Sequence, residues 1–251
     1  MPVVLMGGKA AVYAHGSDLG QDGRAGHPAV TRDTVDAVTF NDTAHRNKAA
    51  LEGVFTFDYT GLFTSTAGRS YTVLNDMWGS GTGNPTPRVL TYWPDSATVT
   101  APGIGFSSAY VSNLQNQGGP GDLEEIAVTI TQDGTFDDLT SLADDNTQTN
   151  TFTGTAIDML SASTGGARIY VNILSNLAVG GNTRWNMTVE HSSNSTGNFI
   201  TATGATGTFG TGTAIGTILL GAGSFRQYVR INGTRDATTG TLRFVAGAKR
   251  V

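Results

Sequence analysis

Residues 125–131 read Glu-Ile-Ala-Val-Thr-Ile-Thr and alternate apolar with polar or small side chains. This period of two is typical of a β-strand that buries one face. Other runs of alternating or β-branched-rich sequence are bounded by Gly, Asn, Asp or Pro: 10–14, 53–60, 88–92, 167–174, 185–191, 216–220, 227–232 and 241–246. Nine strands separated by turn signals predict an all-β sandwich or barrel.

The composition supports the same fold class. Gly occurs 34 times, Thr is abundant, and only 14% of the residues are charged, so strong helix formers are scarce. Two short segments are nevertheless predicted to be helical, 42–51 with Gly53 as its stop and 136–144. Both are too short to be stable without tertiary contacts.

The chain has 251 residues, enough for one large β domain or two small ones. A Gly-rich stretch at 113–122 indicates a division into residues 1–115 and 116–251. The Gly/Thr-rich stretch 201–223 is predicted to be a loop followed by a strand. A faint similarity between the Ala11–Asp42 and Ser108–Asp138 regions leaves open whether the two halves are duplicated modules.

Cysteine is absent, so neither disulfides nor thiolate metal sites can stabilise the fold. The N-terminus lacks the basic and apolar regions of a secretory signal, and no apolar run approaches the ~18 residues of a membrane span. We therefore expect a soluble product of the cytoplasm. The net charge of −5 argues against a surface that grips nucleic acid, which needs clustered Lys and Arg.

The acidic residues are unevenly distributed. Between Arg88 and Arg168 there is no Lys, Arg or His, whereas the same span contains Asp95, Asp122, Glu124, Glu125, Asp133, Asp137, Asp138, Asp144, Asp145 and Asp158. One interpretation is a set of solvated acidic loops. The other is a negative surface that repels a polyanion such as DNA passing along it.

No pattern predicts an enzyme. His15, Ser17 and Asp18 are neighbours in a polar turn, but a catalytic triad is defined by its geometry across a fold. The histidines lack metal-site spacing, and the acidic pairs near residues 137 and 144 lack the register of an EF-hand. The Gly-rich segments lack the Lys-Ser/Thr of a phosphate loop. We expect no catalytic residues, no cofactor and no metal.

Three groups of segments resemble the major tail tube proteins of long-tailed, siphovirus-type bacteriophages, especially those of actinobacteria. The first group is GSDL (16–19), DAVTFNDTAHR (36–46) and LEGVFTFDYTGLF (51–63). The second is GGARIYVNIL (165–174), and the third is WNMTVEHS (185–192), FRQYVRI (225–231) and TLRFVA (241–246). The loop at 193–199 departs from the family pattern because it lacks a tryptophan.

The resemblance implies a β-sandwich or rolled-sheet subunit with little helix, with residues 1–115 belonging to a tail-tube-like module and 116–251 forming a C-terminal β half. Such subunits join their sheets into rings that stack into a tube for DNA ejection, and six chains per ring are favoured over three. The implied partners are further copies of the chain, a tape measure protein, a tail terminator and passing DNA that is not specifically bound. The implied location is the virion tail, after assembly in the host cytoplasm.

We expect part of the acidic span to line the DNA channel, with Asp122, Glu124, Glu125, Asp137 and Asp138 as first candidates, because they flank the predicted strand 125–131. Carboxylates there would keep DNA mobile, since Lys or Arg would hold its phosphates. Two other functions stay open: a capsid decoration or other virion structural protein, and a jelly-roll binding module or adhesin.

Overall fold

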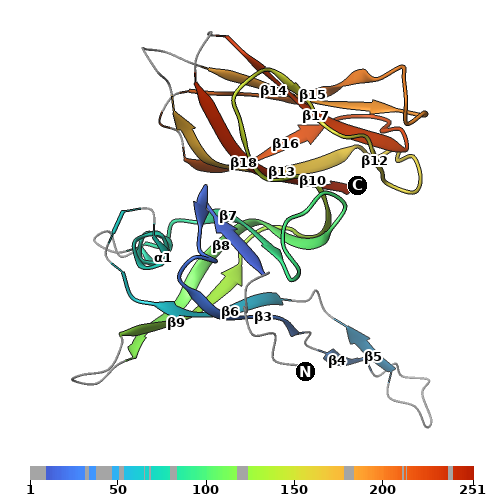
Figure 1. Cartoon of the computed structure of the whole chain (residues 1–251). Helices are drawn as coiled ribbons and strands as arrows, with labels where there is room; N and C mark the ends of the chain where they lie inside the picture. The colour runs from blue at the N-terminus through green and yellow to red at the C-terminus, as the bar shows by residue number, and fades with distance from the viewer. Residues whose placement is uncertain are drawn as a thin grey trace.

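The computed structural model describes residues 10–31, 34–37, 47–50, 54–64, 66–67, 69–79, 84–117, 124–177, 184–210, 212, 214–236 and 240–251. Within these ranges the chain forms antiparallel strands and one helix, which confirms the predicted all-β class. Figure 1 shows two bodies, an N-terminal one that includes the helix and a C-terminal one above it.

The N-terminal half of the chain contributes ten strands and the helix. Their bounds are β1 Ala11–Ala14, β2 Ser17–Asp18, β3 Gly23–Thr31, β4 Thr34–Ala37, β5 Asn47–Ala50, β6 Val54–Leu62, α1 Ser70–Trp78, β7 Arg88–Trp93, β8 Pro102–Gln117, β9 Glu125–Gln132 and β10 Phe136–Gln148. The remaining strands are β11 Phe152–Thr153, β12 Ile157–Asp158, β13 Ala167–Leu177, β14 Trp185–Ser192, β15 Ile200–Phe209, β16 Ile215–Gly221, β17 Tyr228–Arg235 and β18 Thr241–Arg250.

The long strand β8 connects the two bodies. Its first part, from Pro102 to Phe106, pairs with β10, and its second part, from Ala109 to Gln117, pairs with β9. β9 and β10 therefore follow each other along the same edge of β8, with residues 133–135 between them. From there the sheet divides, because β9 continues into β6 and β3, whereas β10 continues into β18, β13 and β16. The boundary expected between residues 115 and 116 lies inside β8.

Each body has its own apolar core. The N-terminal core lies under β1, β6, β7, β8 and β9 and is closed by Leu74 and Met77 of α1. The C-terminal core lies between the β10–β18–β13–β16 branch and a second sheet, and Trp185 is fully buried in it. The second sheet has the order β17–β14–β15, and β11 and β12 both pair with the free side of β17. A third cluster, including Trp93 and Tyr170, packs between the bodies. The two bodies thus share a sheet and a buried interface.

All nine predicted strands are confirmed as β1, β6, β7, β9, β13, β14, β16, β17 and β18. In these runs the alternation of apolar and polar residues within a single strand shows which side faces the core, so each strand can be identified without knowing its partner. The segment 201–223, predicted to be a loop and a strand, contains β15 and β16 and is therefore mostly strand.

Both helix predictions are wrong where the structure describes the segment. Residues 136–144 lie in β10, where Asp137 and Leu139 are buried and Asp138 is exposed, because pairing with β8 and β18 overrides a spacing that looks helical. Residues 47–50 of the other segment form β5, and the rest of that segment lies outside the described residues. The observed helix α1 was not predicted, since its N-terminus has no side-chain cap.

Candidate assembly surface

Four neighbouring strands form a sheet with a solvent-facing side. β3 pairs with β6, β6 with β9, and β9 with residues 109–117 of β8. We call this four-stranded group the open sheet. Phe57, Tyr59 and the three isoleucine and valine residues of β9 point into the core, so the alternate residues of the same strands must point outwards.

Both edges of the open sheet lack a strand partner within the described residues. β3 pairs only with β6, leaving its other edge unpaired along Gly23–Thr31. On the opposite side, β7 pairs with β8 only as far as Ala109, so residues 111–117 pair with β9 alone. An unpaired strand edge presents backbone donors and acceptors to any strand of suitable length, and the two edges are similar in length.

Uncharged side chains dominate the outward side of the open sheet. Cross-strand rows bring together Ala29, Thr56, Thr131 and Tyr110, then His27, Asp58, Thr129 and Asn113, then Ala25, Thr60, Ala127 and Gln115. Many of the polar groups satisfy one another. The Thr129 hydroxyl donates to Asp58 Oδ1 at 2.7 Å, and the Thr131 hydroxyl donates to Ser112 Oγ at 2.7 Å. The fixed charges described on this side are Asp58 and, at one end, the Arg24–Glu125 ion pair.

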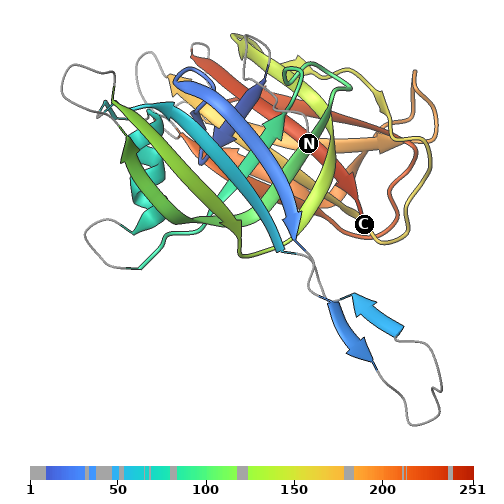
Figure 2. The same ribbon diagram turned by 90° about the horizontal axis from the view of Figure 1, so that it is seen from below.

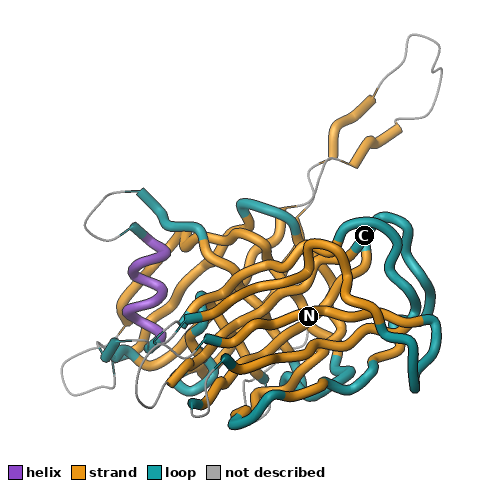
Figure 3. The backbone as a smooth tube through the Cα atoms, turned by 90° about the horizontal axis from the view of Figure 1, so that it is seen from above, coloured by secondary structure: helices purple, strands orange, loops and turns teal. Residues whose placement is uncertain are grey.

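The β4–β5 hairpin stands away from both bodies. It continues from the ends of β3 and β6, and its strands pair with each other from Thr34↔Ala50 to Ala37↔Asn47. Figures 2 and 3 show it projecting beyond the sandwich. Isolated two-stranded hairpins are marginally stable in water, so a hairpin in this position is well suited to packing against another molecule.

The proposed channel residues are dispersed. Asp122 lies outside the described residues, and Glu124 is exposed beside the start of β9. Glu125 lies at the end of the open sheet, where Arg24 pairs with it. Asp138 is exposed on β10, which is separated from β9 by residues 133–135.

Asp137 is buried, which corrects its assignment as a channel residue. Its side chain is 3% exposed, Arg168 donates to its two oxygens at 2.7 and 2.6 Å, and Tyr170 donates a third hydrogen bond at 2.7 Å. Burial alone would raise the pKa of Asp137, but the hydrogen bonds from Arg168 and Tyr170 outweigh it and hold that pKa below the usual range. Its charge is neutralised within the chain.

A second carboxylate of the acidic span is also paired. Arg243 on β18 donates to both oxygens of Asp145 at 2.6 and 2.5 Å, and the Tyr13 hydroxyl donates to the same carboxylate at 3.2 Å. Burial and the nearby Asp145 raise the pKa of Tyr13. This network joins β1 of the N-terminal body to β10 and β18 of the C-terminal body.

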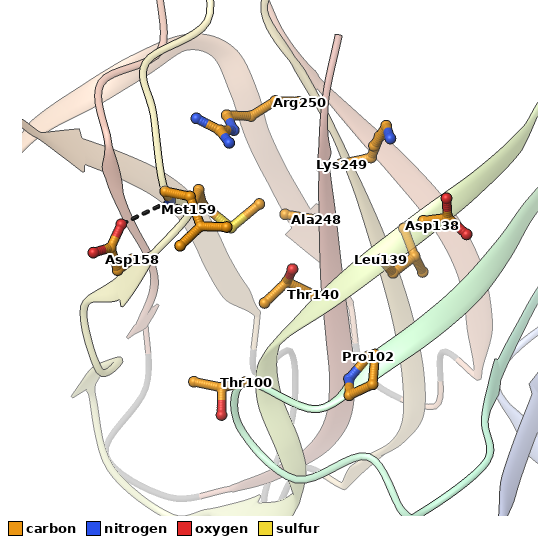
Figure 4. A pocket seen from close by; sticks show the side chains of 11 residues that line it. Thr100, Pro102, Asp138, Leu139, Thr140, Asp158, Met159, Ala248, Lys249 and Arg250 are labelled. Atoms are coloured by element: carbon orange, nitrogen blue, oxygen red, sulfur yellow. Dashed lines mark hydrogen bonds between the residues drawn. The ribbon is translucent and has the colours of Figure 1, made fainter.

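A surface pocket of about 530 Å³ lies where β10, β12 and β18 meet. Asp138, Asp158, Met159, Lys249 and Arg250 are among its lining residues (Figure 4). Asp158 accepts hydrogen bonds from Leu160 N and Gln227 Nε2, so its carboxylate supports the loop. The lining provides no nucleophile held by a base, the arrangement that covalent catalysis requires.

The other sites considered from the sequence do not assemble. His15 lies in the tight turn between β1 and β2, where its backbone N–H donates to Val89 O. Among the described residues no group of three or more His, Cys, Asp or Glu side chains could hold a metal ion. No helix in the described part of the chain is long and apolar enough to cross a membrane.

The open sheet was missed by the sequence analysis because β3 and the second half of β8 are rich in Gly, Asn and Gln. These residues weaken the strand signal. Asp58 was missed as a candidate for the same surface. The alternation in residues 53–60 places Asp58 on the other face of the strand from Phe57 and Tyr59, so the sequence pattern could have identified it.

No protein-family model and no curated protein matches the chain. Solved structures give loose likenesses. The tail of an empty gene transfer agent particle, refined with helical C6 symmetry, has a chain with 11% identity and a TM-score of 0.37 over 47% of this chain and 81% of the other. The SPP1 Dit protein, described as a paradigm of the hub adsorption apparatus in phages infecting Gram-positive hosts, has 8% identity and a TM-score of 0.31 over 96% and 99%. A chain of the phage p2 baseplate in its activated conformation has 9% identity and a TM-score of 0.35 over 97% of this chain and 99% of the other. At these TM-scores the likenesses establish no function.

Proposed function

We propose that this chain is a structural protein of a phage-type virion tail, which assembles into rings that stack into a tube through which DNA passes. The observation that carries the proposal is the open sheet, which has one side in the core, an outward side of mostly uncharged groups, and two edges that have no strand partner among the described residues. The sequence resemblance to siphovirus tail tube proteins points to the same function.

Pairing of β3 in one copy with residues 111–117 of β8 in the next would close a ring of open sheets. A closed ring has no free strand edge, so the same contact that builds the tube prevents uncontrolled sheet growth. The outward sides of the sheets would then line the channel. Their satisfied hydroxyls and lack of clustered Lys or Arg would give DNA phosphates little to bind.

The width of such a channel favours six copies over three. Four strands from each of six copies give about 24 strands, which at about 4.8 Å per strand make a ring about 37 Å across. Three copies give a ring about 18 Å across. Strand tilt widens both rings by roughly a third, and side chains about 5 Å deep narrow the channel from each side, which leaves channel diameters of about 38 Å for six copies and about 14 Å for three. The two grooves of B-DNA are together about 16 Å deep, so a duplex is wider than that and does not fit the smaller channel.

The hairpin β4–β5 provides a means of stacking. It projects from the end of the open sheet, so in a ring the hairpins of all copies would project from the same rim (Figure 2). We propose that they contact the adjacent ring.

Among the candidate channel residues, we propose that Glu124 and Glu125 line the channel together with Asp58, which lies on the outward side of the open sheet.

Negative-stain electron microscopy of the purified chain tests the proposal. Stacked rings or tubes with six-fold symmetry are expected. Three-fold rings would overturn the choice of six copies, and a strictly monomeric protein at all concentrations would overturn the tube function. Decoration of capsids without tube formation would support the capsid reading, and binding of the monomer to glycans would support the adhesin reading.

A further inference from the structure

The long path of paired strands curves until its two ends meet. It runs from β16 through β13, β18, β10, β8 and β7 to β1 and β2. β16 nevertheless lies against β7, and β13 lies against β2. Among the described residues no strand pairing joins these two ends. We call this contact of β13 and β16 with β7 and the β1–β2 turn the seam.

A buried amide and two glycines hold the seam together. Asn172 of β13 is fully buried, its Oδ1 accepts from Gly16 N at 3.3 Å, and its Nδ2 donates to Thr91 Oγ1 at 2.9 Å. Gly16 has a φ of 75°, and a Cβ there would collide with the backbone of β16. On β16 itself, a Cβ at Gly216 would lie 3.0 Å from Val89 Cβ. The two ends of the path therefore touch through a close, specific contact that has no ladder of backbone hydrogen bonds.

On the other side of the same interface, the bodies are joined by a ladder. Residues 136–140 of β10 pair with residues 102–106 of β8. The N-terminal and C-terminal cores are separate, and the cluster that contains Val89 and Trp93 lies between the bodies. Opening of the seam would expose this small cluster and leave both cores and the ladder intact.

Opening would also part a set of contacts beyond the seam. Tyr13 and Asp18 belong to the N-terminal body, and they contact the Asp145–Arg243 pair of the C-terminal body at 3.2 and 3.8 Å. Arg243 keeps its two hydrogen bonds to Asp145, because β10 and β18 are paired strands of one body. The charged pair therefore stays intact when the bodies separate, and contacts of this length to partly exposed groups cost little to break.

We propose that the C-terminal body swings away from the N-terminal body about the β8–β10 ladder, and that the Asn172 amide holds the seam closed. This opening is a step of lower free energy than global unfolding, since each core survives it. Loss of the amide favours the open state, because the closed state then buries the Gly16 N–H and the Thr91 hydroxyl without that partner.

Single cysteines test the opening, since the chain has none of its own. Val89→Cys places a thiol in the seam, and Val189→Cys places one in the C-terminal core, where the side chain is fully buried. In the full-length protein, a thiol reagent is expected to label Val89→Cys faster than Val189→Cys. Its rate should also depend less on urea, because seam opening exposes less surface than unfolding does. Adding Asn172→Ala should speed labelling of Val89→Cys by about tenfold.

Asn176→Ala is the matched control. Asn176 is an equally buried amide on the same strand, but its Nδ2 donates to Phe209 O and Gly210 O within the C-terminal body. Its loss should speed labelling of Val189→Cys and leave the rate at Val89→Cys unchanged, because the open state keeps those bonds. Equal rates and equal urea dependence for the two cysteines, which need no Asn172 variant, would overturn the proposal. So would an Asn176→Ala effect at Val89→Cys as large as that of Asn172→Ala.

Discussion

At the scale of single residues, the most consequential group is buried Asp137 with its partner Arg168, which is partly exposed. Removing the cation leaves a carboxylate that is 3% exposed without its main partner. We expect Arg168→Met to lower the free energy of unfolding by about 3 kcal/mol in urea titrations. The control is Arg24→Met, which breaks the exposed pair with Glu125 and should cost less than about 1 kcal/mol. Equal losses in the two variants would show that Asp137 is not buried.

Two histidines give the fold a pH dependence. Burial lowers the pKa of His191, with a further contribution from Arg226, and burial and Arg88 lower the pKa of His15. Below about pH 6.5 the unfolded chain therefore binds more protons than the folded chain, and stability falls as the pH falls. Unfolding titrations from pH 8 to pH 5 should show this loss, and the His15→Asn, His191→Gln double variant should lose much less stability over that range. An unchanged slope would contradict the assignment.

At the scale of elements, the β4–β5 hairpin can be removed without disturbing the sheet from which it projects. Thr31 and Val54 face each other at the ends of β3 and β6, so a short Gly/Asn turn can replace residues 32–53. We expect the shortened chain to keep its melting temperature and form single rings that no longer stack. Light scattering and electron microscopy distinguish single rings from tubes. Tubes of normal length would show that stacking uses another element.

At the scale of the whole molecule, the outward side of the open sheet should control how DNA moves. Replacing Asp58, Thr60 and Thr129 with Lys adds cations to the proposed channel wall, where they would hold phosphates. We expect slower DNA release from assembled particles, with the largest effect at low salt, where the Debye length is longest.

The matched control for this variant carries Lys at Asn186, Thr206 and Thr208, on the outward side of the C-terminal sheet. It adds cations without placing them on the proposed wall, so its release rate should equal that of the wild type. If the two triple variants slow release equally, the open sheet does not line the channel.

Strand periodicity was readable because it is a local property. The alternation in Glu125–Gln132 depends only on which residues face the core, and one strand reports that without its neighbours. The same reasoning failed for β10, whose Phe136, Leu139 and Leu142 have helical spacing. Only pairing with β8 and β18 makes that segment a strand. It also failed for α1, because the carboxylate of Asp22, rather than a residue next to the helix, bonds its first turn at Ser70.

The sequence by itself determined the all-β class, nine of the strands and the lack of a cation between Arg88 and Arg168. Only the tertiary structure decided what that acidic span does. Strands distant in sequence bring Arg168 to Asp137 and Arg243 to Asp145, so two carboxylates that looked free to face DNA are neutralised inside the chain. The edges of β3 and β8 that lack a partner among the described strands could not be predicted either, because an edge is defined only once the neighbours of each strand are known.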